Sequence, residues 1–186
     1  MDEFRDDPGN FFSPLDALRP WVGRIEAKAR PRTWPYTCGI KDTDASLVMV
    51  RRAAVSPDEL ASFVRSVEED LTRQGRARQG PPMVVVRKTA GEAPEAAPRF
   101  EVAVWVPVAP GTSPPQGFEA RSLPGEPVAY TVHHGRADGL GAAESVLAAW
   151  VRMKSLAFGL EVRRVYLKRG KNPRKDVTEV QIPLSR

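Results

Sequence analysis

With 186 residues, the chain is long enough for one domain of about 150 residues and a tail. Hydrophobic residues make up 41% and charged residues 27%, as in a soluble globular protein. The net charge is +5, but the 23 acidic residues are interspersed among the basic ones, so there is no basic block that would indicate nucleic-acid binding. The single cysteine excludes an internal disulfide and no apolar stretch reaches the length of a membrane span, so we expect a cytoplasmic protein.

Residues 1–35 are expected to form an N-terminal extension, partly disordered or with a short helix. Several prolines interrupt this segment, and its apolar residues follow no sustained period. It is too short for a helix-turn-helix module with its own core, so we expect no element that reads DNA. We assign residues 36–186 to the folded domain.

The first predicted unit, at about residues 46–108, has the order strand, helix, strand, strand. Ser46–Val55 is rich in β-branched residues, which favours a strand. Ser56 and Glu59 then form a capping box around a proline at the first helical position. Apolar residues at spacings of three and four continue the helix. Two further strands are predicted at residues 81–88 and 100–108.

The second predicted unit, at about residues 126–184, repeats this order. A helix with an apolar stripe begins at Leu140 and is expected to end near Gly159. The interval between matching residues is nearly constant, as between Pro107 and Pro183, so a β-α-β-β unit is duplicated in tandem. The duplication predicts an α+β fold in which both helices cover one face of an antiparallel sheet. The strands of this unit are predicted at residues 126–135, 162–169 and 177–184.

Successive side chains of a strand point to opposite faces, which assigns each residue to one side of the sheet. Val102, Val104 and Val106 should pack under the first helix, and Val180 and Ile182 under the second. In the strand at 162–169, we expect Val165 and Leu167 on the helix side. By elimination, the helix-free face should carry Glu101, Trp105, Tyr166, Glu179 and Gln181, with Arg164 and Lys168.

Glu179 is the main candidate for a functional side chain, with two readings open. It can be a solvated glutamate on the wet face of an antiparallel sheet. It can also be a carboxylate in an apolar cleft, where it would bind a cation or accept a proton. Trp105 and Tyr166 can stack on a flat ligand or offer a ring face to a cation, or can be ordinary sheet packing.

Other patterns indicate no cofactor. His133 and His134 are adjacent, so they point to opposite faces and do not predict a metal site. Residues 138–144 lack the spacing and the lysine of a phosphate-binding loop. The basic residues between Arg163 and Lys175 are expected to form a solvated hairpin or, alternatively, to bind an acidic partner protein or nucleic acid.

Six segments in this order resemble the GyrI-like small-molecule-binding domain, the effector-binding module of many AraC- and MerR-type regulators, which is also found alone. They are SPDELASFV, QGPPMVVV, FEVAVWVPV, YTVHHG, VYL and VTEVQIPL, and the resemblance covers Tyr36 to Leu184. It implies a curved sheet whose concave face holds a ligand. It also implies that Glu179 is the pocket glutamate that neutralises cationic aromatic ligands, with Tyr166 as the tyrosine of the family.

The chain departs from the family pattern in two places. Arg136 and Ala137 follow Gly135 where the family often has Pro-Tyr. The segment after VYL is the basic KRGKNPRK, where many members have a short acidic or Asp-Pro turn. A positive rim would repel small cations.

The resemblance implies three functions. The leading one is a stand-alone protein that sequesters or senses a hydrophobic, aromatic and in some cases cationic drug or toxin, held by Glu179, Tyr166 and Trp105 with Glu101 and Gln181. The second is a hydrolase of cyclopropane-bearing alkylating compounds, in which Glu179 would activate water and Tyr166 would hydrogen-bond the substrate carbonyl. The third is a protein-interaction role, such as modulation of DNA gyrase, through the basic hairpin at residues 163–175.

Overall fold

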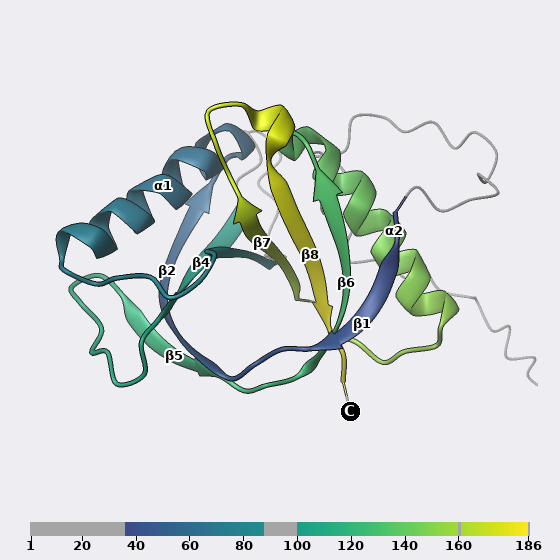
Figure 1. Ribbon diagram of the computed structural model, residues 1–186, viewed down its shortest axis with the longest axis horizontal. Coiled ribbons are helices and arrows are strands. Elements are labelled where there is room, and N and C mark those ends of the chain that lie inside the picture. The colour runs from purple at the N-terminus through teal and green to yellow at the C-terminus, as the bar shows by residue number, and fades with distance from the viewer. Residues whose placement is uncertain (1–35, 88–99, 160, 186) are drawn as a thin grey trace, which may run out of the picture.

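The computed structural model describes residues 36–87, 100–159 and 161–185 (Figure 1). Eight strands form one antiparallel sheet in the order β1-β6-β8-β7-β3-β4-β2-β5, and two long helices lie on the outer side of its curve. The expected α+β class is therefore confirmed. The strands are β1 (Cys38–Asp42), β2 (Ser46–Val55), β3 (Met83–Arg87), β4 (Phe100–Val108), β5 (Glu119–Leu123), β6 (Pro127–His134), β7 (Val162–Lys168) and β8 (Val177–Pro183); the helices are α1 (Pro57–Arg73), α2 (Leu140–Met153) and the 3-10 turns η2 (Ala137–Gly139) and η3 (Pro173–Lys175).

The element order β-α-β-β occurs twice, as β2-α1-β3-β4 and as β6-α2-β7-β8. The two sets of strands join edge to edge, because β3 pairs with β7 and Met83 lies opposite Val165. The sequence pattern does not predict β1 and β5, which extend the two edges of the sheet. Their sequences, CGIKD and EARSL, lack the runs of β-branched residues that favour strands. The sheet therefore has two more strands than the six that the sequence predicts, one at each edge.

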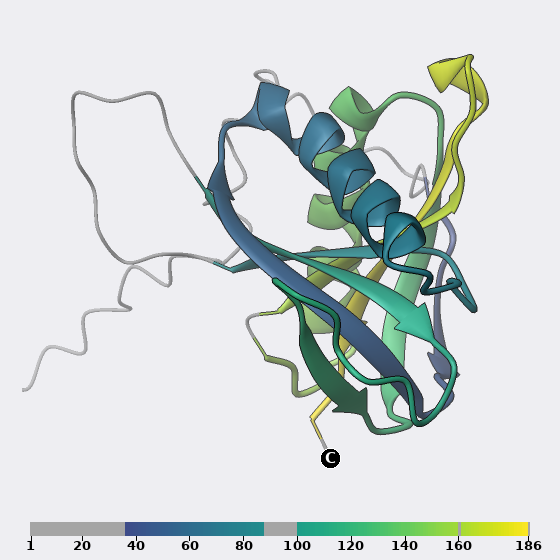
Figure 2. The ribbon, with the colours of Figure 1, turned by 90° about the vertical axis from the view of Figure 1, so that its left-hand side faces the viewer.

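The helix side of the sheet holds two apolar clusters, one under each helix. Both helices lie on this side (Figures 1 and 2). Helix α1 begins after Ser56 as expected, since the Ser56 backbone N–H donates to the Glu59 carboxylate at 2.8 Å. The valines of β4 pack under α1 and those of β8 under α2, as the alternation predicts. The α1 cluster includes Leu60, Val64, Val67, Leu71, Val102, Val104 and Val106; the α2 cluster includes Leu140, Ala143, Leu147, Val151, Val180 and Ile182.

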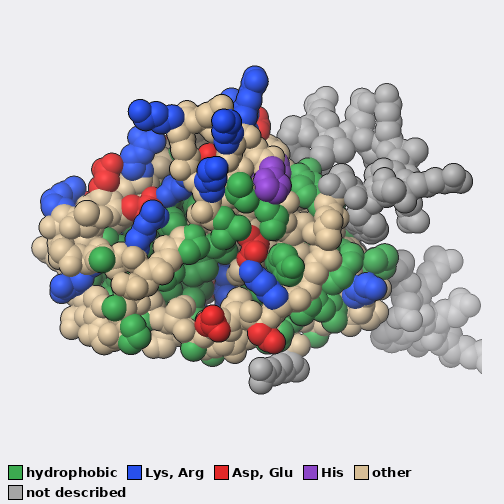
Figure 3. Space-filling view, in the orientation of Figure 1, with side chains coloured by type: hydrophobic (Ala, Val, Ile, Leu, Met, Phe, Trp, Pro, Cys, Tyr) green, Lys and Arg blue, Asp and Glu red, His purple; other side chains and the backbone are tan. Residues whose placement is uncertain are grey.

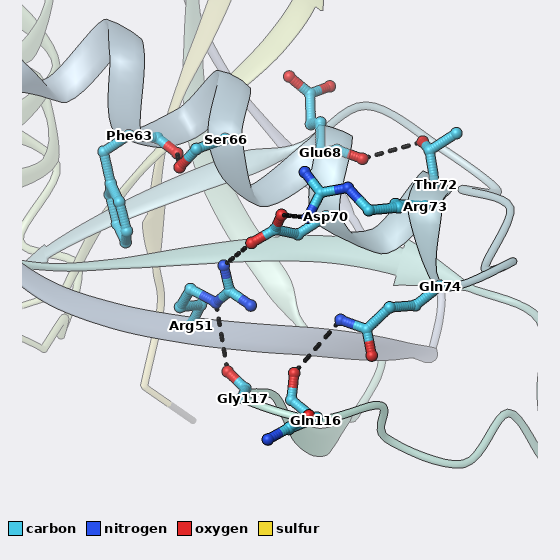
Figure 4. Close-up of polar contacts among 10 residues, drawn as sticks. All are labelled: Arg51, Phe63, Ser66, Glu68, Asp70, Thr72, Arg73, Gln74, Gln116 and Gly117. Carbon is cyan, nitrogen blue, oxygen red and sulfur yellow. Dashed lines mark hydrogen bonds and ion pairs between the residues drawn. The ribbon is translucent and has the colours of Figure 1, made fainter.

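A polar link ties the C-terminal half of α1 to the sheet (Figure 4). The Arg51 guanidinium of β2 binds the Asp70 carboxylate of α1, and Arg73 also binds Asp70 at 2.8 Å. Arg51 Nε donates to the carbonyl oxygen of Gly117 at 3.2 Å, so one side chain connects α1, β2 and the turn before β5. The hydrogen bond from Arg51 lowers the pKa of Asp70, and the charges of Arg51 and Arg73 act in the same direction.

Replacing Asp70 by asparagine is expected to make the stability less dependent on acid pH. A carboxyl group with a lowered pKa in the folded state contributes stability above its unfolded pKa of about 3.9, and this contribution is lost as the pH falls through the folded value. The variant should therefore be less stable than the native protein at pH 7. At a pH well below 4, the difference in stability between the two proteins should become smaller. Urea denaturation at both pH values measures this, with Asp138→Asn as an exposed control. An equal difference at both pH values would contradict the role of Asp70.

Candidate functional site

The concave face of the sheet, opposite the helices, is built around Trp105. Cross-strand pairing aligns Val50, Trp105, Met83, Val165 and Glu179 in one row across β2, β4, β3, β7 and β8. Figure 3 looks onto this face and shows hydrophobic side chains in its hollow with acidic and basic side chains beside them. The buried hydrophobic residues of this face, named here the Trp105 cluster, are Val48, Val50, Met83, Val85, Ala103, Trp105, Leu123 and Val165.

Two arginine side chains cover the indole of Trp105, which is 0% exposed. The guanidinium of Arg121 lies 4.7 Å from the ring centroid and that of Arg163 lies 5.3 Å from it, within the range of cation–π contacts. Arg163 also binds Glu126 and Glu161, each at 2.7 Å. The indole Nε1 is buried without a hydrogen-bond acceptor. An aromatic floor therefore lies under a cover of long, charged side chains.

Glu179 lies at one end of this row, 5% exposed, and its carboxylate already has partners. Its Oε1 accepts from Gln181 at 2.6 Å and lies 2.7 Å from the Lys41 ammonium, and its Oε2 accepts from Lys41 at 2.8 Å. Lys41 comes from β1, and its Nζ lies 5.0 Å from the ring centroid of Tyr130. Glu179 is therefore a buried carboxylate in an ion pair rather than a solvated surface residue.

A cavity of about 640 Å³ lies along β1 and β6. Val132 and Tyr130 line it, and they lie opposite Glu179 and Gln181 in the register of β6 and β8. Gly39 permits the close approach of the Tyr130 ring, since a Cβ at this position would lie 3.0 Å from its Cε1. The cavity therefore lies at the β1 edge of the sheet, and Glu179 itself is not among its lining residues. The lining residues are Tyr36, Thr37, Cys38, Gly39, Tyr130, Val132, His133 and His134.

Four of the five predicted site residues lie on the concave face, and Tyr166 does not. Trp105, Glu179 and Gln181 are buried there, and Glu101 is exposed toward the start of β4. The prediction for β7 is wrong, because Val165 belongs to the Trp105 cluster and Tyr166 packs against the α1 cluster. Apolar residues do not identify the helix side in β7, since both of its faces are buried.

The reversed face of β7 separates the two residues that the hydrolase hypothesis requires. Tyr166 and Glu179 lie on opposite faces of the sheet, so they do not converge on one substrate. Burial raises the pKa of the Tyr166 phenol. The tyrosine on the side of Glu179 is Tyr130, which the alternation of YTVHHG could have identified. Lys41 and Arg121 were also missed, because they belong to the two strands that the sequence pattern does not predict.

The basic segment at residues 163–175 is not one exposed hairpin. Arg163 is buried on the concave face and Arg164 is buried on the helix side, where it pairs with Glu144 of α2 at 2.5 Å. Only the basic residues from Lys168 onward are exposed or partly exposed. Arg163 and Arg164 therefore do not belong to the solvated basic surface that the sequence predicts for residues 163–175.

Neither histidine of the chain forms part of a metal-binding cluster in the described ranges, where no three potential ligands gather. The two ring nitrogens of His133 lie 2.9 Å from the Tyr36 hydroxyl and 2.9 Å from the Arg136 carbonyl oxygen. His133 thus joins the chain before β1 to the turn before α2. Within the described residues, no helix is long and apolar enough to cross a membrane.

Similar folds occur among solved structures, at low sequence identity. The chain matches EcmrR in a DNA complex with a TM-score of 0.73, 15% identity and coverage of 83% of this chain, and it spans only 59% of that protein. It matches the isolated C-terminal domain of EcmrR with a TM-score of 0.67 and 15% identity, covering 82% of this chain and 99% of that domain. SAV2435 bound to tetraphenylphosphonium matches with a TM-score of 0.55 and 10% identity, covering 80% and 94%.

At the level of sequence, no curated protein matches. The GyrI-like small molecule binding domain matches residues 37–185, which include every described strand and helix. The matched range agrees with the resemblance from Tyr36 to Leu184 that the sequence motifs indicate. The chain therefore belongs to the GyrI-like small-molecule-binding domain family.

Proposed function

We propose that the protein binds a hydrophobic aromatic small molecule on its concave face, over the Trp105 cluster. The observation that carries the proposal is an aromatic floor covered by arginine side chains rather than by a second layer of the fold. Ligand sites are typically apolar and aromatic, with a few polar groups that orient the ligand. Here Glu179, Gln181 and Lys41 would be the polar groups at one end.

Binding would require movement of the cover and not of the sheet. Because Trp105 is 0% exposed, a ligand reaches the indole only when the Arg121 side chain swings away. A guanidinium on a flexible stem has many accessible rotamers, so this movement is less costly than a shift of packed strands. A flat ring stacked on the indole would gain about 0.5–1.5 kcal/mol beyond the burial of its area.

The family and one structural neighbour support this role. GyrI-like domains bind small molecules, and SAV2435, which shares this fold, has been solved with tetraphenylphosphonium. Binding without conversion agrees with the position of Tyr166 on the opposite face from Glu179. The bound compound would be sequestered or sensed.

Thermal unfolding with 2-naphthamide, a neutral and flat probe, tests the proposal. At about 100 times its dissociation constant, the probe should stabilise the folded protein by roughly 2.7 kcal/mol. Trp105→Phe should weaken the binding by about twofold to tenfold through loss of stacking area. Trp150→Phe is the matched control, since Trp150 packs with the α2 cluster on the other side. Equal weakening in both variants, or no stabilisation of the native protein, would contradict the site.

A further inference from the structure

We propose that the concave face prefers aromatic acids, and that Lys41 is the residue that excludes aromatic cations. This inference rests on the proposed function and adds the charge of the ligand to it. It differs from the cationic ligand that the motif around Glu179 implies. The argument depends on which charged groups of this face already have partners.

Glu179 is unavailable to a cationic ligand because Lys41 occupies its place. Both carboxylate oxygens lie within 2.8 Å of the Lys41 ammonium, and Gln181 donates a further hydrogen bond. A ligand cation would have to displace the Lys41 ammonium. Because Lys41 is part of β1, its ammonium has a high effective concentration beside Glu179. The Lys41 charge would remain beside the incoming cation, and like charges disfavour each other.

Three other acids beside this face are paired as well, whereas Glu101 is exposed toward the start of β4. Glu119 binds Arg52 at 2.6 Å, and Glu126 and Glu161 share Arg163 at 2.7 Å each. Two donors differ from these groups. The Arg121 guanidinium has no carboxylate partner in the described part of the chain, and the buried Trp105 Nε1 has no acceptor. Because Arg121 stacks on Trp105, the two donors lie side by side.

The Arg121 guanidinium over the Trp105 ring fits an aromatic ligand that carries a carboxylate. The ring would replace the guanidinium over the indole, and the displaced Arg121 would bind the carboxylate at the edge of the ring. A hydrogen bond between charged groups is stronger than one between neutral groups, and the guanidinium fork matches the two oxygens of a carboxylate. A neutral ring would gain the stacking but not this ion pair.

Three probes of the same shape test the inference by isothermal titration calorimetry on the full chain at low salt. They are 2-naphthoate, 2-naphthamide and 2-naphthylmethylammonium. We expect naphthoate to bind at least tenfold more tightly than naphthamide, as for a charge-assisted hydrogen bond. We expect naphthylmethylammonium to bind more weakly than either. A cation that binds as tightly as naphthoate would overturn the inference.

Two variants assign the preference to its residues. Arg121→Met should bring the ratio of naphthoate to naphthamide affinity close to one, and an unchanged ratio would overturn the role of Arg121. Lys41→Met should free Glu179 and strengthen ammonium binding about tenfold or more. Lys41→Met/Glu179→Gln removes both charges, so it should fold even if the single variant does not, and it should lack this gain. A gain in the double variant would overturn the role of Glu179.

The control is Lys175→Met, which removes an exposed positive charge from η3, outside the concave face. All three affinities should match those of the native protein. A loss of naphthoate preference in this control would show that net charge decides selectivity, and it would overturn the inference. Binding of naphthamide with no preference for naphthoate would overturn the inference and leave the proposed function standing. No binding of any probe would overturn both.

Discussion

An Arg164→Met variant is expected to unfold with a free energy about 3–5 kcal/mol lower than that of the native protein. Arg164 is 2% exposed and Glu144 is 1% exposed, and the two side chains bind each other at 2.5 Å between β7 and α2. Burial lowers the pKa of Arg164, but the Glu144 carboxylate outweighs this effect and holds the pKa above its ordinary value. Without the guanidinium, the buried Glu144 charge loses its counter-ion.

Urea denaturation monitored by circular dichroism measures this loss. The double variant Arg164→Met/Glu144→Met should recover much of it, because a buried ion pair replaced by apolar side chains is often neutral in stability. Arg136→Met is the exposed control, since Arg136 and Asp138 pair at the surface, and it should change stability by less than about 0.5 kcal/mol. A double variant as unstable as the single one would show that packing, and not charge pairing, explains the effect.

Trp105→Ala is expected to destabilise the protein by about 3–5 kcal/mol, as for other buried aromatic residues replaced by alanine. Among the described residues, Trp105 has the largest of the fully buried side chains. Its neighbours Val50, Met83 and Val165 lie in the same cross-strand row. These neighbours belong to three strands, β2, β3 and β7, which are held in the paired sheet and cannot collapse into the vacated space. A cavity therefore adds to the lost burial of the indole.

Trp150→Ala is the matched comparison, because Trp150 is only partly buried against the α2 cluster. It should lose clearly less stability than Trp105→Ala in the same denaturation experiment. Binding of 2-naphthamide should survive in Trp150→Ala and disappear in Trp105→Ala at a temperature where both are folded. Equal stability losses would contradict a special packing role for Trp105.

The sequence predicted the faces of β4 and β8 correctly and those of β7 incorrectly, for a physical reason. In β4, valines alternate with residues of other kinds, and α1 covers the valine face. In β7, charged and apolar residues share both faces, because Arg164 has an acidic partner on α2 and Val165 has an apolar neighbour in Trp105. Alternation identifies the core side only where one face lacks buried polar partners.

Several site residues depend on pairing between distant strands. Lys41 reaches Glu179 because β1 adds to β6, which itself pairs with β8. Arg121 reaches Trp105 because β5 adds to β2, which pairs with β4. Neither short strand has a pattern that predicts it, so no local signal could place these two charges.

Local patterns in the sequence were sufficient for the two long helices, the six strands of the two repeats, the tandem order and the family, because capping residues and apolar periodicity act over a few residues. Only the tertiary structure decided that Glu179 is neutralised by Lys41, that arginines cover Trp105 and that Tyr166 faces α1. Each of these contacts joins residues far apart in the chain, and long-range strand pairing sets which side chains meet.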